Sequence, residues 1–258
     1  MQSSVTIAGA ALSGLAGRLD LTRSSRLKIN LIDDRRRSRP IALKVKNIRI
    51  ENHLVNLGRR RPIRVVEHLF SALYSLNFFA VRIDLYRDEL PFFDGSSLAY
   101  AYALAKLGSP RTAPKIHPPQ AFRVQRGRSF LEYRPEPDDR LVVDMTLRHA
   151  FIGTQRYELN VAPGTYKKEI APARTFVFTD EHDPRLTLLP PYGFALTRRG
   201  YLSSAPLRFP DEAVRHKILD LLGDLYVLGG RLCGTITGHN TSHILNYKLV
   251  HKILESIS

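Results

Sequence analysis

A proline-rich polar segment, GSPRTAPKIHPP (108–119), divides the 258-residue chain into two stretches of similar length. Prolines recur through this segment, and a proline inside a helix removes a backbone donor and clashes with the preceding turn. We therefore interpret it as a linker between an N-terminal domain, residues 1–107, and a C-terminal domain, residues 120–258. Each stretch is long enough to bury a core of its own.

The two stretches carry the same kinds of pattern. Before the linker, the segments RLDLTRS, IALKVKNIRI and AVRIDLY alternate apolar and polar residues, which is typical of strands, whereas VVEHLFSALYSL (65–76) has helical spacing. After the linker, RLVVDMTL and QRYELNVA indicate strands. The segment VRHKILDLLGDLYVL then places one apolar stripe along a helix, formed by Val214, Ile218, Leu221, Leu225 and Leu228. The sequence predicts two α+β domains of related design.

Residues 180–206 interrupt this pattern with four prolines among charged and aromatic residues, and we expect a long loop or a small insert there. The opening MQSSVTIAGAALSGLAG predicts a strand and a glycine turn, because it lacks the basic start and apolar run of a signal peptide. No run reaches the ~18 apolar residues that a membrane span needs. With a single cysteine, Cys233, the chain has no disulfide framework, so we expect a cytoplasmic protein.

Positive charge dominates the chain and is concentrated in its first half. The net charge is +15, and residues 1–117 hold 20 basic and 9 acidic side chains. Two arginine clusters, 35–39 and 59–64, supply much of the excess. Such a surface suits an anionic substrate such as a nucleotide diphosphate, an anionic membrane or nucleic acid, or it only keeps the protein soluble. Because no nucleic-acid-binding motif accompanies the clusters, we expect no specific nucleic-acid partner.

A line of polar residues follows the second predicted helix. His216, Asp220 and Asp224 stand four residues apart, so they stack on one helix face away from the apolar stripe. A histidine and a carboxylate at this spacing can hold one cation, as paired histidines do on zinc-protease helices. The alternative is the solvated face that any surface helix presents.

The first predicted helix begins with Glu67 and His68. The histidine could be a third ligand, and the glutamate beside it could act on a bound water. Two histidines and one carboxylate with an open fourth position hold catalytic zinc. The alternative for His68 is a helix-end histidine satisfied by hydrogen bonds.

The segment GHNTSHILN (238–246) joins an apolar strand to the last predicted helix. His243 could donate a proton while Asp224 holds its tautomer, and His239 competes for the same role. Alternatively the segment only caps the helix, through Asn240, Thr241 or Ser242.

Several ordered motifs resemble one family. They are VEHLFSAL, ELPFFDGSS (89–97), HAFIGTQRYEL (149–159), EIAPARTFVF (169–178), LRFPDEAVRHKILDLLGDLYVLGG (207–230) and SHILNYKL (242–249). Together they cover most of the chain and resemble the UDP-3-O-acyl-N-acetylglucosamine deacetylases, the zinc amidases of lipid A synthesis. The resemblance implies an α+β fold of two similar domains, each a small sheet with two helices. The helices would be packed between the sheets, with the site at the domain junction.

The resemblance also implies a role for each matching residue. The implied zinc ligands are His68, His216 and Asp220, and iron is the alternative metal. Glu67 would be the general base, His243 the general acid and Asp224 its orienting partner. Thr175 would stabilise the oxyanion, Phe176 would line the sugar site, and Lys217 would face the phosphates of a UDP-amino-sugar.

The sequence departs from the family pattern in three places. GAALSG (9–14) lacks the family's histidine, residues 240–242 replace a lysine-serine-glycine, and PPYGFALTRRGYLSS (190–204) replaces a longer segment that builds the acyl-chain passage. A divergent paralogue that deacylates another N-acetyl amino-sugar is therefore an alternative, and a non-catalytic basic binding protein is a third. We expect a monomer that can contact an anionic membrane at its surface.

Overall fold

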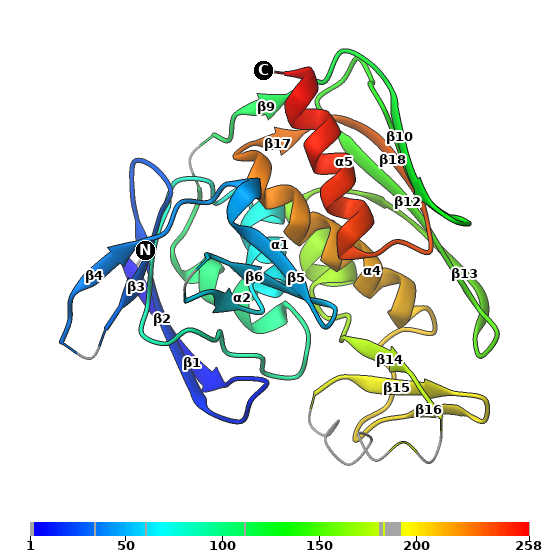
Figure 1. Cartoon of the computed structure of the whole chain (residues 1–258), viewed down its shortest axis with the longest axis horizontal. Coiled ribbons are helices and arrows are strands. Elements are labelled where there is room, and N and C mark those ends of the chain that lie inside the picture. Colours follow the sequence, from blue (N-terminus) through cyan, green and yellow to red (C-terminus); the bar gives the residue numbers. More distant parts are fainter. Residues whose placement is uncertain are drawn as a thin grey trace.

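The computed structural model describes residues 3–33, 35–59, 61–110, 112–180, 183 and 192–257. Two five-stranded sheets lie on opposite sides of a group of helices (Figure 1). The first sheet is built from β1 (Ser4–Ala10), β2 (Ala16–Arg23), β3 (Lys28–Ile32), β4 (Ser38–Pro40) and β8 (Val81–Leu85). Its helices are α1 (Glu67–Ser75) and α2 (Leu98–Lys106).

The second sheet belongs to the second half of the chain. Its strands are β10 (Phe122–Arg126), β11 (Ser129–Arg134), β12 (Leu141–His149), β13 (Gly153–Asn160) and β18 (Gly234–His239). The main helices of this half are α4 (Glu212–Leu225) and α5 (His243–Ser256). Short helical turns accompany them: α3 (Pro163–Thr165), η2 (Tyr166–Ile170) and η4 (Tyr226–Leu228).

One strand order is used twice. The first sheet runs β1-β2-β8-β3-β4 and the second runs β10-β11-β18-β12-β13. Among the described residues, each sheet has one parallel pair, β3 with β8 in the first and β12 with β18 in the second, and its other pairs are antiparallel. In chain order, the last strand of the first sheet is β8, with α1 before it and α2 after it. The last strand of the second sheet is β18, with α4 before it and α5 after it. The expected α+β fold of two related halves is confirmed, while the domain bounds 1–107 and 120–258 remain a prediction.

Three small sheets complete the fold. They are β5 (Ile48–Glu51) with β6 (Leu54–Leu57) and β7 (Ile63–Arg64), β14 (Phe176–Phe178) with β15 (Phe194–Thr197) and β16 (Gly200–Leu202), and β9 (Lys115–Ile116) with β17 (Arg231–Leu232). β14 precedes the segment 180–206, and β15 and β16 lie within it, so the described part of this insert contains strands. The linker contains β9, whose pairing with β17 attaches it to the second half.

The strand expected over residues 41–50 is wrong for most of its length. Residues 41–44 are irregular, Val45–Asn47 form the 3₁₀ turn η1, and only Ile48 onward is strand. Asn47 explains the break, because its side-chain amide donates to the carbonyl of Ala42 at 2.9 Å and its backbone N–H to that of Lys44 at 2.8 Å. Such local bonds compete with a strand ladder.

The core is one apolar cluster that spans both halves, and α1 packs on α4 within it. The predicted stripe of α4 and η4 is buried along its whole length. His216, Asp220 and Asp224 are buried as well, at 3%, 4% and 0% exposed. The interpretation of these three as a solvated face is therefore wrong, and they require partners inside the protein.

The two arginine clusters meet in space. Arg39 donates a side-chain hydrogen bond to the carbonyl of Arg61 at 3.0 Å. Arg60 of the second cluster, Arg111 of the linker and residues 181, 182 and 184–191 of the insert lie outside the described residues. Within the described part of the chain, no helix is both long and apolar enough to cross a membrane.

Candidate active site and metal centre

Two of the predicted site residues, Glu67 and His68, begin α1. Val65, just before the helix, has a φ of 62°, which is strained for a β-branched residue. Glu67 accepts a hydrogen bond from the backbone N–H of Val55 at 3.2 Å, and the carbonyl of His68 accepts one from the hydroxyl of Ser97 at 2.6 Å. Both side chains are buried.

Gly223 brings α4 against this helix end. A Cβ built on Gly223 would lie 2.3 Å from the carbonyl oxygen of Glu67, so only glycine allows the two backbones to approach so closely. The approach brings together three possible metal ligands from two helices that are far apart in the sequence. One ligand atom each of His68, His216 and Asp220 lie within 4.8 Å of one another.

The donor set fits a metal. His216 Nε2 lies 3.3 Å from Asp220 Oδ1, close to the ~3.3 Å edge of a tetrahedron around zinc with bonds of about 2 Å. His216 Nδ1 donates to the carbonyl of Ala173 at 3.1 Å, the second contact that metal-ligating histidines usually make. His68 stacks on Phe92 at 5.2 Å between ring centroids, and its buried Nδ1 has no hydrogen-bond partner among the described residues.

The electrostatics suit a cation at this point. Burial, with His216 nearby, lowers the pKa of His68 to about 3, so the ring is neutral and can act as a ligand. Burial also lowers the pKa of His216. Burial raises the pKa of Asp220, but the positive charge of Lys217 is the largest opposing effect and holds that pKa below its ordinary value. Lys217 Nζ lies 2.7 Å from Asp220 Oδ2. The centre therefore combines neutral imidazoles with a charged carboxylate.

Glu67 is a buried carboxyl group beside this centre. Burial raises its pKa to about 8, against the opposing attraction of His243. A carboxyl group that titrates near neutral pH is suited to accept and release a proton.

His243 begins α5, after Ser242 has capped the helix by accepting from the N–H of Leu245. Its Nδ1 lies 2.7 Å from Asp224 Oδ2, and Asn246 donates to the same oxygen at 2.7 Å. Burial disfavours the charged ring, but the carboxylate of Asp224 outweighs burial and raises the pKa of His243 to about 9. Ser242 caps the helix as the sequence alternative expected, and His243 has an acidic partner as well.

His239 lies elsewhere. It stands at the end of β18 and stacks on Phe130 at 6.0 Å between ring centroids. Asp224 therefore pairs with His243 and not with its competitor.

Phe176 and Lys217 contact the metal-ligand cluster, and Thr175 is the residue before Phe176. Thr175 donates its N–H to the carbonyl of Gly95 at 2.7 Å and accepts from the N–H of Phe194 at 3.1 Å. The Phe176 ring lies 6.1 Å from the ring of His216 and 6.0 Å from Lys217 Nζ. The structure thus brings Phe176 and Lys217 to the metal-ligand cluster, whereas the placement of Thr175 at the site remains a prediction.

Two other features are weaker candidates. His117, Asp139 and Cys233 also have ligand atoms within 4.8 Å of one another, but Lys115 pairs with Asp139 and the thiol of Cys233 points at the carbonyls of Asp139 and Arg231. Burial also raises the pKa of that thiol, which disfavours the thiolate that a metal needs.

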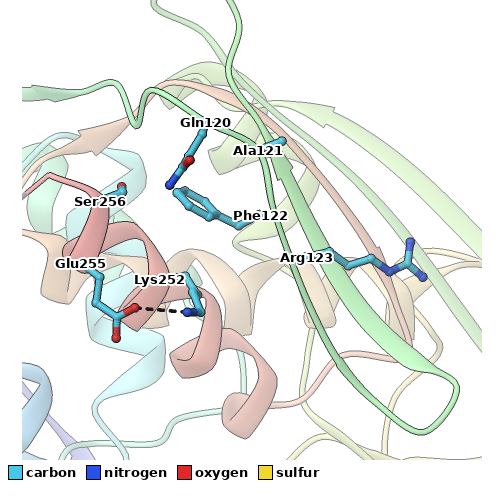
Figure 2. A pocket seen from close by; sticks show the side chains of 7 residues that line it. All are labelled: Gln120, Ala121, Phe122, Arg123, Lys252, Glu255 and Ser256. Atoms are coloured by element: carbon cyan, nitrogen blue, oxygen red, sulfur yellow. Dashed lines mark hydrogen bonds and ion pairs between the residues drawn. The ribbon is translucent and has the colours of Figure 1, made fainter.

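A groove of about 350 Å³ opens between β10 and the end of α5 (Figure 2). It is lined by Gln120, Ala121, Phe122, Arg123, Lys252, Glu255 and Ser256, and Lys252 pairs with Glu255 across 3.3 Å. None of the nine predicted residues lines it, so chemistry is expected at the buried cluster instead.

Sequence reasoning missed four features of this region. They are the glycines that allow close backbone contacts (Gly95, Gly193 and Gly223), the second donor to Asp224 (Asn246), the hydroxyl on the His68 carbonyl (Ser97), and a buried ion pair (Arg174 with Glu212). The spacing of His243 and Asn246, three apart at a helix start, could have indicated a shared partner. The other features depend on long-range contacts that no local spacing reveals.

Two histidines and an aspartate, with a buried carboxyl group and a charged histidine beside them, have the composition of a metal-dependent hydrolase. Comparison with known proteins makes this class specific. Residues 3–255 match the family model of UDP-3-O-acyl N-acetylglycosamine deacetylase, and the chain belongs to that family. It is therefore an enzyme of a metal-dependent family of amide hydrolases.

Curated relatives agree with the family model. A protein of Wolinella succinogenes is 34% identical over 233 residues, which cover 83% of this chain and 76% of the relative. A protein of Campylobacter jejuni (strain RM1221) is 34% identical over 211 residues, covering 77% and 71%. A protein of Nautilia profundicola is 34% identical over 206 residues, covering 73% and 68%. All three relatives are named UDP-3-O-acyl-N-acetylglucosamine deacetylase.

Proposed function

We propose that this enzyme hydrolyses the acetamide of a UDP-3-O-acyl-N-acetylglucosamine, releasing acetate and the free amine, as a step of lipid A biosynthesis. One observation carries the proposal: the ligand atoms of His68, His216 and Asp220, from two separate helices, converge within 4.8 Å in a buried centre of a chain of this family.

His68, His216 and Asp220 would hold the metal, most simply zinc, with iron as the alternative. When bound, the metal supplies a Lewis acid that polarises the acetamide carbonyl and makes a water acidic near neutral pH. The neutral imidazole of His68 and the charged carboxylate of Asp220 support this assignment.

Two proton transfers complete the hydrolysis. Glu67 accepts a proton from the attacking water as the water oxygen bonds to the carbonyl carbon. The buried carboxyl group of Glu67, with a pKa raised to about 8, supports this role. His243, kept charged by Asp224, gives a proton to the amine nitrogen as the C–N bond breaks. The hydroxyl of Thr175 donates a hydrogen bond to the carbonyl oxygen as it gains negative charge.

Phe176 and Lys217 would contact the substrate. We assign the Phe176 ring to the sugar, and Lys217 to the phosphates of the UDP group. Lys217 would then leave or share its contact with Asp220 Oδ2. The strongly basic first half suits a doubly charged diphosphate. We further propose that the enzyme acts in the cytoplasm as a monomer and can approach an anionic membrane surface.

The first experiment measures the metal content of the purified protein and of His216→Ala, together with amine release from UDP-3-O-acyl-N-acetylglucosamine. We expect about one metal per chain, lost with the histidine, and amine release only by the metal-bound protein. Bound metal without amine release would contradict the substrate assignment, and absence of bound metal would contradict the metal centre.

A second candidate substrate is another N-acetyl amino-sugar. The observation that favours it is the insert, whose described part has only β15 and the short hairpin to β16. The resemblance implies a longer segment for the acyl chain at this place. Assays of acylated and unacylated UDP-N-acetylglucosamine side by side distinguish the two. Equal rates on both would exclude the lipid A assignment and support the second candidate.

A further inference from the structure

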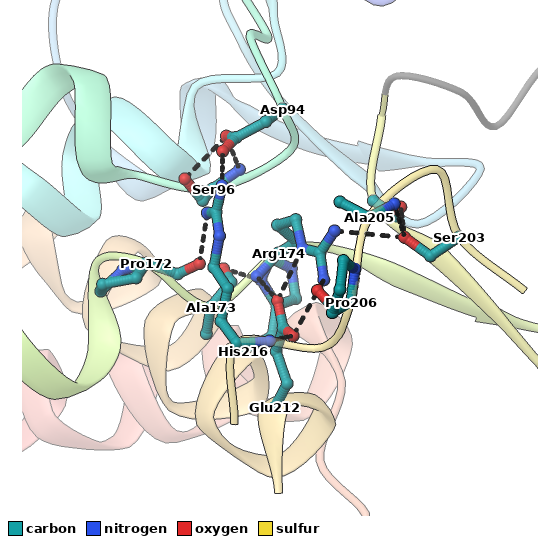
Figure 3. Close-up of polar contacts among 12 residues, drawn as sticks. Asp94, Ser96, Pro172, Ala173, Arg174, Ser203, Ala205, Pro206, Glu212 and His216 are labelled. Atoms are coloured by element: carbon teal, nitrogen blue, oxygen red, sulfur yellow. Dashed lines mark hydrogen bonds and ion pairs between the residues drawn. The ribbon is translucent and has the colours of Figure 1, made fainter. Parts of the chain in front are cut away.

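A buried ion pair, Arg174 with Glu212, lies one helical turn from His216 on α4 and has no part in the proton transfers. Arg174 and Glu212 side chains are 4% and 0% exposed, and they form two hydrogen bonds, Nε to Oε1 at 2.8 Å and Nη2 to Oε2 at 3.1 Å. The guanidinium also donates to the hydroxyl of Ser203 at 3.1 Å and to the carbonyl of Pro206 at 2.8 Å (Figure 3). Buried charges are tolerated when they are paired and fully hydrogen-bonded in this way.

Glu212 also binds backbone. It is the first residue of α4, and it accepts the N–H of Arg174 at Oε1 (2.9 Å) and the N–H of Arg208 at Oε2 (2.7 Å). A carboxylate at a helix N-terminus is favoured by the helix dipole. The pair therefore fastens two chain segments to the first turn of α4.

One turn further along α4, His216 holds the other end of the same peptide group. The carbonyl of Ala173 and the N–H of Arg174 belong to a single planar unit. His216 Nδ1 donates to that carbonyl at 3.1 Å while Glu212 accepts from that N–H. Since a carbonyl can only accept, this contact requires the proton on Nδ1 and leaves Nε2 free to face Asp220.

The next residue in the chain is Thr175. Its N–H and carbonyl are bound by Gly95 and Phe194, and its methyl group would lie 2.7 Å from a Cβ at Gly95 and 2.8 Å from one at Gly193. The direction of the Ala173–Arg174 peptide plane therefore affects two site residues together: the tautomer of His216 and the placement of Thr175.

We propose that the Arg174–Glu212 pair is a positioning device, which fixes the Ala173–Arg174 peptide plane so that its carbonyl selects the His216 tautomer and its neighbour Thr175 faces the site. The inference rests on the proposed function for the roles of His216 and Thr175. Neither member of the pair is one of the predicted metal ligands or proton-transfer groups.

The test compares three variants with a matched control. Glu212→Gln removes the charge but keeps an amide oxygen, and Arg174→Met/Glu212→Leu removes both charges and so leaves no unpaired buried ion. Arg156→Met is the control, because Arg156 binds Asp144 with two similar bonds, 2.8 and 2.7 Å, on the exposed face of the second sheet. Arg174→Lys keeps the charge but loses the planar fork.

The readouts are the zinc dissociation constant, the His216 tautomer from ¹⁵N shifts of metal-free protein, and kcat separately from KM. We expect the double variant to fold, to lose the single Nδ1–H tautomer, and to bind zinc about 10–100-fold more weakly. We also expect its kcat to fall more than its KM changes, whereas Arg174→Lys recovers part of the loss and Arg156→Met matches wild type. Glu212→Gln carries the same readouts should the double variant not fold.

Wild-type tautomer and zinc affinity in folded Glu212→Gln and double variants would overturn the inference and leave a purely structural pair. Failure of the proposed function is distinguishable, because wild-type protein would then release no amine. The tautomer in metal-free protein would still report on the peptide plane.

Discussion

The α-carbon of Gly223 lies so close to Glu67 that an added methyl group would stand 2.3 Å from the Glu67 carbonyl oxygen. Glu67 and its neighbour His68 begin α1, and Gly223 lies between Asp220 and Asp224 on α4. This close approach of the two helices is thus next to the residues that form the predicted site. The separation of α1 and α4 sets how far the metal donors lie from one another.

Gly223→Ala should weaken metal binding and destabilise the fold. The new methyl group forces α1 and α4 apart, which costs about 1–3 kcal/mol of unfolding free energy and moves His68 away from His216 and Asp220. Isothermal titration with zinc and thermal unfolding measure the two effects. Gly164→Ala is the control, because a Cβ there meets no atom within 4 Å. Unchanged zinc affinity in Gly223→Ala would show that the helix spacing does not set the site.

Glu67→Gln should strongly reduce turnover without removing the metal. The amide keeps the shape of the side chain and can still accept the Val55 N–H, but it cannot take a proton. We expect kcat to fall by a factor on the order of 10²–10⁴ while metal content stays at the wild-type level. Glu255→Gln, in the groove of Figure 2, should leave kcat unchanged. Substantial activity in Glu67→Gln would assign the base to another group.

Chelation should lower the thermal stability, and zinc should restore it. A ligand at 100 times its dissociation constant stabilises the folded state by about 2.7 kcal/mol. His216→Ala should lose this zinc-dependent shift in melting temperature, whereas His117→Ala, in the second cluster, should keep it. If His117→Ala lost the shift and His216→Ala kept it, the metal site would instead be formed by His117, Asp139 and Cys233.

His243 should make the stability of the metal-free protein depend on pH. Asp224 raises its folded pKa to about 9 against burial, and Asp220 and Glu67 add to the effect. The unfolded pKa of a histidine is about 6.5. The stabilisation of the folded state by charged His243 is therefore fully present below pH 6.5 and is lost as the pH rises through 9. The difference in unfolding free energy between wild type and His243→Gln should therefore shrink between these values. A difference that stays flat or grows would mean that the ring is neutral in the folded protein.

Strong local periodicity made much of the fold predictable. The apolar stripe of α4 and the alternation in β2, β8, β12 and β13 each reflect one buried face, which local sequence records directly. The strand predicted over residues 41–50 was wrong because Asn47 bonds to nearby backbone, an effect that alternation does not register. The repeated strand order was also beyond local reasoning, since the parallel pairs β3–β8 and β12–β18 join distant segments.

The site was predictable in part for the same reason. Helical spacing places His216 above Asp220, but their meeting with His68 depends on the approach at Gly223, far away in the sequence. The contact of Arg174 with Glu212 likewise joins a loop to a helix start that no periodicity connects. Burial of the polar line on α4 could not be read from the sequence either, because a solvated face has the same spacing.

The repeated strand order also bears on how such a site can arise. Two units of one topology that face each other through equivalent helices, α1 and α4, have the arrangement of a symmetric dimer joined into one polypeptide. In a dimer of identical chains every substitution appears on both sides of the interface. Joining the copies lets each accumulate substitutions of its own. One copy here contributes Glu67 and His68 and the other contributes His216, Asp220 and Asp224. In a homodimer of one such unit, each copy would have to carry both sets of residues.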